Sequence, residues 1–566
     1  MPAKGLSVVL PITGWLPGYN RKWLTPDVMA GLALWAVMVP EGMAYAGIVG
    51  VPPIMGLYTV IPPLFAYALF GTSRRLVVGP DTATGVISAL TVGAVVAHGS
   101  PQFAALTSTL AVLIGALFLV FGILRTGWVA AFVATPVMRG FIEGLVCVTI
   151  IGQVASLLGL HGAAGNFIQK TLFILGHFGD VSVPGAITGM LSLAAMLLLR
   201  RFAPRAPAAL VVAATATIAM ALLGSIPGVD LVGVLPSGLP QIHAPSLDPS
   251  VLRQLLPGAL SIVLVGYAEA LGGAKAASAG ERIDPNQELV AHGFANLASG
   301  FFSGFLVVGS LSKTSVAISA GARTQVANLV GAILCLATLL FLTPLFRTLP
   351  HPTLAAIVIA AMLHLSKPAY LKTLAKQSPP EFWVAMAVIA GELVLGVLQG
   401  IALGVVISLL LLIYRASHPL GAVLGKLPGE DAYRDIRLHP EAQTYPGLLI
   451  WNPGGPLFFA NAERSEADLK AAIAQNPSPV RHVLVDASAI TFIDSSAREV
   501  FSRLIGDLRR RKITMSFARL RDPVLLTLEK GGIVDALGRS SFHERLTEGC
   551  QAFLDSAPNA GRTSPA

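Results

Sequence analysis

Long apolar stretches separated by short polar breaks fill the chain from Val28 to about Ile413. Many of them are long enough to cross a hydrocarbon core of about 30 Å, and they lack the short alternating strands of a membrane barrel. The pattern predicts a polytopic α-helical membrane protein with 14 membrane segments, two of them half-length. The predicted segments are 28–48, 53–70, 80–97, 104–123, 133–158, 186–200, 208–224, 256–276, 287–304, 311–320, 324–343, 351–365, 382–398 and 400–414.

Two of these segments share a sequence repeat. LVVGPDTATGVISAL occupies 76–90 and LVVGSLSKTSVAISA occupies 306–320, so Leu-Val-Val-Gly twice precedes hydroxyl-bearing and apolar residues. One interpretation is chance similarity between apolar segments. The other is a transporter site, which is typical of interrupted hydrophobic segments at corresponding places in two halves. Each copy lies at the third segment of a group of seven, which predicts an inverted repeat of residues 28–224 and 256–415.

The interrupted segments predict an anion site. The N-termini of the two half-helices should meet near the membrane midplane, where free N–H groups and positive dipole ends favour negative charge. Lys313 is the positive side chain there, and it would either attract the anion or neutralise Glu41 or Glu269. Asp81 is expected mainly to cap its half-helix, because aspartate is a favoured N-cap residue. The residues expected to contact the anion are Glu41, Tyr45, Asp81, Thr82, Ala83, Ser310, Leu311, Ser312 and Lys313.

A carboxylate also interrupts the apolar run LPGALSIVLVGYAEALGGA, at Glu269. Ionisable residues inside a membrane are costly and by default indicate an ion or proton pathway. We expect Glu269 to couple transport to a proton, because no Ser or Thr lies within one turn of it to help bind the alternative, sodium. The alternative is that Glu269 forms a structural ion pair with Lys313. The other ionisable residues in or near segments are expected at helix ends or in packing: Glu143, His292, His364 and Glu392.

Composition and charge agree with a membrane protein. The chain is 54% hydrophobic and 12% charged, with a mean hydropathy of +0.71. Its net charge of +9 comes from Lys and Arg in loops that alternate with the segments, which predicts cytoplasmic N- and C-termini and a multi-pass protein of the cell (inner) membrane. We expect residues 1–27 to be a cytoplasmic segment without a cleavable signal. Insertion topology explains these charges better than nucleic-acid binding.

The sequence does not indicate an enzyme or a metalloprotein. Cys147, Cys335 and Cys550 are far apart and odd in number, so neither a disulfide framework nor a metal site is expected. The chain contains no nucleotide-binding loop, zinc-ligand spacing or nucleophile elbow. We therefore expect no cofactor and no catalytic residue.

Beyond Ser417 the charge density rises and the apolar runs shorten, which predicts a soluble α/β domain at 438–556 after a linker at 417–437. Residues 557–566 should be a disordered tail. The predicted strands are Leu448–Trp451, Leu457–Phe459, Val480–Val485 and Ile513–Ala518, and the predicted helices are Ala462–Ala474 and Ser496–Arg511.

Several motifs resemble the sulfate permease (SulP) family over nearly the whole chain. They are VPEGMAYAGIVGVPPIMGLY at 39–58, NQELVAHGFANLASGFFSGF at 286–305, GSLSKTSVAISAGARTQ at 309–325 and YPGLLIWNPGGPLFFANAE at 445–463. Asp486 and Asp494-Ser495-Ser496 match the pattern of a STAS domain. The resemblance implies a core domain that carries the substrate, a gate domain, and a STAS domain that regulates the protein or assembles it as a homodimer. It also implies transport of sulfate, bicarbonate, chloride or dicarboxylates, commonly with protons or sodium.

Two departures from the family pattern change the charge of the expected site. Glu41 follows Pro40 where the family usually has Gln, and Lys313 stands where the family commonly has Arg. The substrate is therefore not carried over from the resemblance. In the STAS-like domain, Asp494-Ser495 resembles the phosphorylatable loop of anti-sigma-factor antagonists, although Ser495 would equally suit a helix cap. A cytoplasmic protein is the candidate partner of this domain.

The sequence thus predicts a secondary active transporter of sulfate, bicarbonate or a dicarboxylate, proton-coupled, in which a core domain moves against a gate domain. The alternatives are a sodium-coupled bicarbonate transporter, an anion exchanger, a nucleobase permease of similar architecture, and a membrane-anchored regulatory module.

Overall fold

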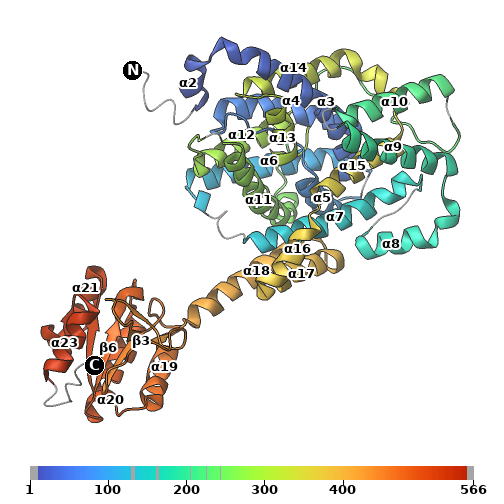
Figure 1. The fold of residues 1–566 in the computed structure, drawn as a ribbon. Coiled ribbons are helices and arrows are strands. Elements are labelled where there is room, and N and C mark those ends of the chain that lie inside the picture. The colour runs from blue at the N-terminus through green and yellow to red at the C-terminus, as the bar shows by residue number, and fades with distance from the viewer. Residues whose placement is uncertain are drawn as a thin grey trace. The chain divides into compact units, whose positions relative to one another are not determined.

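The computed structural model describes residues 10–97, 99–128, 134–160, 165–203, 206–224, 226–242, 244–278 and 280–556. The chain divides into two compact units, Met1–Ser408 and Leu409–Ala566, which we describe separately (Figure 1). The tail expected at 557–566 lies outside the described residues.

The first unit is a bundle of helices, and a helix lies at each of the predicted membrane segments. Among the described residues, nine helices are long and apolar enough to cross a membrane, so the full number of spans stays a prediction. The helices at the predicted segments are α3 (Leu24–Val49), α4 (Pro53–Phe70), α5 (Thr82–Gly93), α6 (Pro101–Ile123), α7 (Thr135–Leu157), α9 (Val183–Phe202), α10 (Ala208–Leu223), α11 (Pro249–Ala277), α12 (Pro285–Phe301), α13 (Leu311–Ser319), α14 (Val326–Ala337), α15 (His351–Leu365), α17 (Pro379–Val394) and α18 (Val397–Ser417).

The sequence interpretation missed short helices beside these segments. They are α2 (Ile12–Trp15), α8 (Phe167–Gly176) and α16 (Pro368–Gln377). Helix α8 begins with a capping box, in which Asn166 accepts a hydrogen bond from the Gln169 amide and the Gln169 side chain accepts one from the Asn166 amide. These helices are too short to cross a bilayer by themselves.

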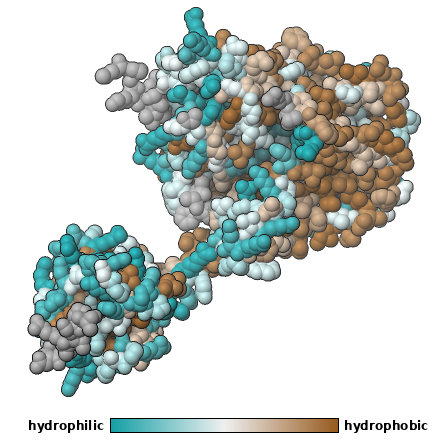
Figure 2. Space-filling view, in the orientation of Figure 1, coloured by the Kyte–Doolittle hydropathy of each residue, from teal (hydrophilic) through white to brown (hydrophobic). Residues whose placement is uncertain are grey.

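A broad apolar surface covers part of the first unit. Figure 2 shows hydrophobic side chains gathered on the face that α9 and α10 occupy in Figure 1. Such a large apolar surface is unfavourable in water and is expected on a protein that faces lipid. Exposed apolar side chains of these two helices include Val183, Ile187, Leu191, Phe202 and Leu222.

The second unit is a mixed sheet with helices on both faces. The strand order is β4-β3-β5-β6-β7-β8, in which β5 to β8 are parallel and β3 is antiparallel to both of its neighbours. Helix α20 buries one apolar face against the sheet, and α23 covers the opposite face. The elements are β3 (Ala422–Lys426), β4 (Tyr433–Asp435), β5 (Leu448–Asn452), α19 (Ala462–Gln475), β6 (His482–Asp486), α20 (Ser495–Arg510), β7 (Thr514–Ala518), α21 (Asp522–Lys530), α22 (Ile533–Leu537), β8 (Phe542–His543) and α23 (Leu546–Ser556).

Two sequence predictions for this unit need correction. The range 417–437, expected to be a linker, contains β3 and β4, which belong to the sheet. Leu457–Phe459, expected to be a strand, forms only a single bridge between Leu457 and Ile493. The reason is local, because Phe458 donates its amide hydrogen to the Asn461 side chain and its carbonyl accepts from the backbone that opens α19. A turn into the helix thus replaces the strand.

Candidate functional site

The two copies of the repeat meet in the structure. Strand β1 (Val78–Gly79) pairs antiparallel with β2 (Val308–Gly309), so that Val78 faces Gly309. Helices α5 and α13 start two or three residues after these strands and therefore have their N-termini close together. Helix α5 has 12 residues and α13 has 9, so they span only about 18 Å and about 14 Å. The prediction of two converging half-length helices is confirmed.

Lys313 lies at the centre of this meeting point and is fully buried. Its Nζ atom donates a hydrogen bond to the Pro80 carbonyl at 2.9 Å and lies 3.4 Å from Glu41 Oε2. It also lies 4.8 Å from the centre of the Tyr45 ring, close enough for a cation–π contact. Of the two carboxylates proposed as its partner, Glu41 is the one at ion-pair distance.

Helix α3 supplies both Glu41 and Tyr45 to the site. The two residues are four positions apart and share one face of the helix, as their spacing predicts. The Tyr45 hydroxyl lies 3.4 Å from Glu41 Oε2, and both side chains are buried. Pro40 precedes Glu41 inside the helix and has no N–H group to donate, which leaves a break in the helical hydrogen bonds next to the site.

Small and hydroxyl-bearing residues surround the two helix starts. Asp81 is the N-cap of α5, and its Oδ2 accepts a hydrogen bond from the Ala83 amide at 2.8 Å, as the sequence predicts. Ser310 is buried, and its Oγ lies 3.1 Å from that of Ser312, which is exposed. Of the remaining residues expected to contact an anion, Thr82 and Ala83 are buried and Leu311 is exposed.

Glu269 lies on α11, which packs against β2 and both half-helices. A Cβ on Gly309 would lie 3.0 Å from the Ala270 Cα, so the backbones approach closely beside Glu269. One carboxylate oxygen, Oε2, is buried and has no hydrogen-bond partner among the described residues. The charges of Asp81 and Lys313 are close enough to interact with it. Glu269 is therefore next to the site but outside the Lys313–Glu41 ion pair.

Sequence reasoning missed three groups at the site. The Pro80 carbonyl, a backbone group that no residue pattern indicates, is the hydrogen-bond acceptor for Lys313. Thr84 and Ser88 lie four positions apart on α5, and their hydroxyl oxygens are buried without partners among the described residues. Their spacing of one helical turn was the available signal.

The four ionisable residues left out of the site lie elsewhere. Glu143 on α7 accepts hydrogen bonds from the Ser366 hydroxyl and the Lys367 amide, both just past the end of α15. His292 is buried, with its Nδ1 2.8 Å from the Glu288 carbonyl one turn earlier on α12. His364 is exposed in the last turn of α15, and Glu392 is buried in the packing of α17.

In the second unit, Asp494 rather than Ser495 caps α20. Asp494 accepts hydrogen bonds from the Ala497 amide at 2.8 Å and the Phe459 amide at 2.9 Å. Ser495 is the first residue of the helix and is exposed. The capping interpretation of Ser495 is therefore wrong, and phosphorylation stays a prediction.

Comparisons with known proteins agree with this architecture. A model of the Sulfate permease family matches residues 24–388, and a STAS domain model matches residues 439–548. A protein named "Probable sulfate transporter" from Mycobacterium tuberculosis is 33% identical over 549 residues, which are 95% of this chain and 98% of that protein. "Sulfate transporter 4.1, chloroplastic" from Arabidopsis thaliana is 31% identical over 572 residues, 97% of this chain and 83% of that protein.

Solved structures show the same fold. The murine Solute Carrier 26 family member A9 anion transporter, in its inward-facing state, aligns with a TM-score of 0.89 at 21% identity, covering 98% of this chain and 96% of that one. The transmembrane domain of a cyanobacterium bicarbonate transporter, BicA, aligns with a TM-score of 0.61 at 24% identity, covering 68% of this chain and 98% of that one.

Proposed function

Because this chain belongs to the sulfate permease family, whose members are transporters and not enzymes, we propose that it carries a small oxyanion by secondary active transport. The proposed substrate site lies between the N-termini of α5 and α13. The observation that supports it is the buried Lys313 at the point where the two helix starts meet. Backbone N–H groups, helix dipoles and this ammonium group all favour a negative charge there.

Sulfate is the first substrate to test, because relatives that are similar over nearly the whole chain carry sulfate transport in their names. A tetrahedral oxyanion can accept hydrogen bonds from the amide groups at the start of α13 and from the Ser310 and Ser312 hydroxyls, whereas the Ala83 amide at the start of α5 already donates to Asp81. Bicarbonate and dicarboxylates can accept hydrogen bonds from the same donors. We include them because Glu41 stands where the family usually has Gln and changes the charge of the site. The substrate would be released when the site that contains these donors becomes accessible from the other side of the membrane.

The charge balance of the site supports proton coupling. Lys313 provides one positive charge, whereas Glu41, Asp81 and Glu269 would together provide three negative charges if all were ionised. An arriving anion would be repelled unless a carboxylate is neutralised first. A membrane potential, negative inside, opposes anion entry by a further about 2.3 kcal/mol per charge per 100 mV. A proton taken up with the anion neutralises one carboxylate and cancels one of the negative charges that cross the membrane, so a divalent anion needs a second proton for full compensation.

Glu269 is the proposed proton carrier. Its Oε2 atom has no hydrogen-bond partner in the part of the chain that the structure describes and can take a proton without breaking one, whereas Glu41 is held by Lys313. A sodium ion would need several oxygen ligands around the same carboxylate. Sodium-coupled transport and anion exchange are the two alternatives to this proposal.

Movement of one group of helices past another is the proposed transport step. Helices α7, α9, α15 and α17 pack on one another. Helices α3 and α11 pack against both half-helices, α4 and α14 pack on α3, and α12 packs on α4. We assign the first group to the gate and the second to the core. The second unit is assigned to the cytoplasm, where it would regulate the protein or assemble it as a homodimer. Both termini are placed in the cytoplasm, and the protein in the cell (inner) membrane.

Uptake into proteoliposomes tests this function. Labelled sulfate, bicarbonate and succinate are offered with an imposed proton gradient or sodium gradient, and uracil serves as the nucleobase control. We expect accumulation of at least one anion that follows the proton gradient, with no uptake of uracil. Accumulation that requires sodium, or one-for-one exchange insensitive to pH, would support the alternatives. Uptake of uracil alone would reject anion transport.

A further inference from the structure

An apolar cavity of about 220 Å³ lies in the first unit between α6, α11 and the start of α12, which pack on one another (Figure 1). Helix α11 supplies most of its wall, and the apolar lining includes Phe121, Leu260, Leu264 and Leu289. An apolar cavity of about 150 Å³ already holds a molecule such as benzene. This cavity therefore has room for a segment of hydrocarbon chain.

Two of the side chains that line the cavity carry a polar atom, and both are engaged with backbone carbonyl groups. The Thr126 hydroxyl donates a hydrogen bond to the Phe121 carbonyl oxygen at 2.9 Å. The Tyr267 hydroxyl lies 3.0 Å from the Gly127 carbonyl oxygen and 2.8 Å from that of Pro285. Because a buried water needs several polar partners, this lining favours an apolar occupant.

Exposed apolar side chains border the cavity on two of its helices. Leu256 and Leu260 are exposed on α11, and Ile123 and Leu124 are exposed at the end of α6. In a protein that spans a membrane, exposed side chains of this kind are expected to face the hydrocarbon of the bilayer. A lipid acyl chain is therefore the apolar group within reach of the cavity.

Two exposed arginines lie on the loops at the end of the cavity where the Tyr267 hydroxyl is bound. Arg125 directly precedes the lining residue Thr126. Arg282 lies three residues before Pro285. The two loops meet there, since a Cβ on Gly127 would lie 2.9 Å from the Pro285 Cβ. Neither arginine has a carboxylate partner among the described residues.

The carboxylates of the second loop have partners of their own. Asp284 accepts hydrogen bonds from the Asn286 amide at 2.9 Å and from the Gln287 amide at 3.2 Å. Glu281 lies 3.7 Å from the Arg74 guanidinium. Positive charge is thus available where the two loops meet. Both loops are expected on the cytoplasmic side, where basic side chains attract anionic lipids.

We propose that this cavity binds one anionic phospholipid, with part of an acyl chain against Leu264 and the Tyr267 ring and the phosphate group at Arg125 and Arg282. Arginine presents paired donors that match phosphate oxygens. The acyl chain would supply the packing contacts that an empty apolar cavity lacks. The proposal does not depend on the transported substrate, so it and the proposed transport function can fail separately.

Native mass spectrometry of the purified full-length protein tests the proposal. The protein is mixed with equal amounts of dimyristoyl phosphatidylglycerol and dimyristoyl phosphatidylcholine, which share their acyl chains and differ in headgroup charge. We expect one phosphatidylglycerol molecule to be retained per chain, at least about fivefold above phosphatidylcholine. Retention of neither lipid, or retention of phosphatidylcholine equal to or above that of phosphatidylglycerol, would overturn the proposal.

A larger side chain locates the acyl chain. Leu264→Trp fills the cavity and leaves both arginines in place, so the retained phosphatidylglycerol should be lost. The matched control is Leu191→Trp, at an exposed position of α9 outside the cavity, which should retain the lipid as the parent does. Melting temperatures of the same preparations show whether each variant is folded. Unchanged retention in a folded Leu264→Trp protein would overturn the proposal.

The headgroup contacts are tested by Arg125→Gln combined with Arg282→Gln. Retention of phosphatidylglycerol should fall to the level of phosphatidylcholine, because the charged donors are lost while the cavity is unchanged. The control is Arg201→Gln, an exposed arginine at the end of α9, which should keep the preference of the parent. A preference that survives in the double variant would place the lipid on another surface and overturn the proposal. This variant decides the question if Leu264→Trp does not fold.

Discussion

The ammonium group of Lys313 lies 3.4 Å from a carboxylate oxygen of Glu41, although the two residues come from opposite halves of the chain. Lys313 enters from the second copy of the repeat, and Glu41 from the long helix that precedes the first copy. Both are buried, so neither charge is well solvated. A buried pair of this kind is costly to break by removing one partner. It therefore connects the two halves at the point where an anion would bind.

Lys313→Ala should lower anion uptake at least about tenfold, because the site loses its positive side chain and retains Glu41 as an unpaired negative charge. The Glu41→Gln/Lys313→Ala double variant removes both charges and should express and melt closer to the parent than Lys313→Ala does. Initial uptake rates in proteoliposomes, with melting temperatures of the same preparations, are the measurements. Uptake unchanged in a well-folded Lys313→Ala protein would contradict a substrate role.

Glu269→Gln should abolish accumulation driven by a proton gradient while exchange of bound anion persists. Glutamine has nearly the shape of glutamic acid but cannot take up or release the proton. The measurement is labelled-anion uptake with and without a pH gradient, beside counterflow in the absence of a gradient. Lys275→Gln, which removes an exposed ionisable side chain from the same helix, is the matched control. Proton-driven accumulation that survives in Glu269→Gln would exclude this residue as the carrier.

Glu392→Gln should leave the melting temperature unchanged or raise it. The Glu392 carboxylate is 1% exposed, and neither of its oxygens has a partner among the described residues, so an ionised form there would be unfavourable. By contrast, Gly140→Ala should lower the melting temperature, since a Cβ at Gly140 would lie 2.5 Å from the backbone carbonyl oxygen of Ala385 on α17. Thermal unfolding of the two variants in one detergent compares them. A large loss of stability in Glu392→Gln would show that the carboxylate has a partner.

The second unit should lose stability as the pH falls from about 6.5 to about 4. Burial lowers the pKa of His482 from 6.5 to about 4, and its ring nitrogens lie 2.6 Å from Thr514 Oγ1 and 2.7 Å from Ser516 Oγ. Below pH 6.5 the unfolded chain binds a proton that the folded chain does not accept until about pH 4, so unfolding is favoured in that window. Hydrogen exchange in β6 and β7 of the full-length protein measures it.

The control for this prediction is His482→Gln, which has no titrating ring and should show a flatter dependence on pH between these two values. The parent and the variant should differ little in slope above pH 7, where His482 is neutral in both states. An equal slope in the two proteins would assign the pH dependence to other groups.

The amino-acid sequence by itself determined the membrane helices and the two half-helices. Apolar length and period are local properties, so the helix positions follow from them without knowledge of any partner. The Asp81 cap and the shared face of Glu41 and Tyr45 are equally local, since one helical turn relates the groups involved. The convergence of the helix starts was also predictable, because a repeat in two halves implies symmetry.

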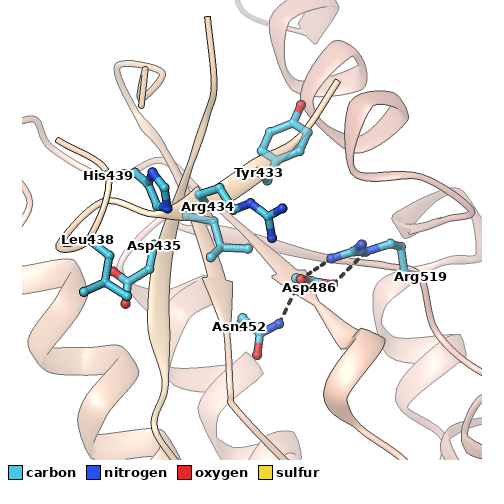
Figure 3. A pocket seen from close by; sticks show the side chains of 9 residues that line it. Tyr433, Arg434, Asp435, Leu438, His439, Asn452, Asp486 and Arg519 are labelled. Atoms are coloured by element: carbon cyan, nitrogen blue, oxygen red, sulfur yellow. Dashed lines mark hydrogen bonds and ion pairs between the residues drawn. The ribbon is translucent and has the colours of Figure 1, made fainter. Parts of the chain in front are cut away.

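Only the tertiary structure decided which charges meet. Spacing along the chain cannot choose between Glu41 and Glu269 as the partner of Lys313, because that choice depends on how α3 and α11 pack around α13. The same holds for the Pro80 carbonyl, which no side-chain pattern reveals. In the second unit, strand β3 contains a glycine, so its own residues indicate a strand only weakly. Its pairing with β5 decided that this segment forms a strand. The cavity lined by Arg434 of β4, Asp486 of β6 and Arg519, which follows β7, exists only after the sheet has brought these residues together (Figure 3).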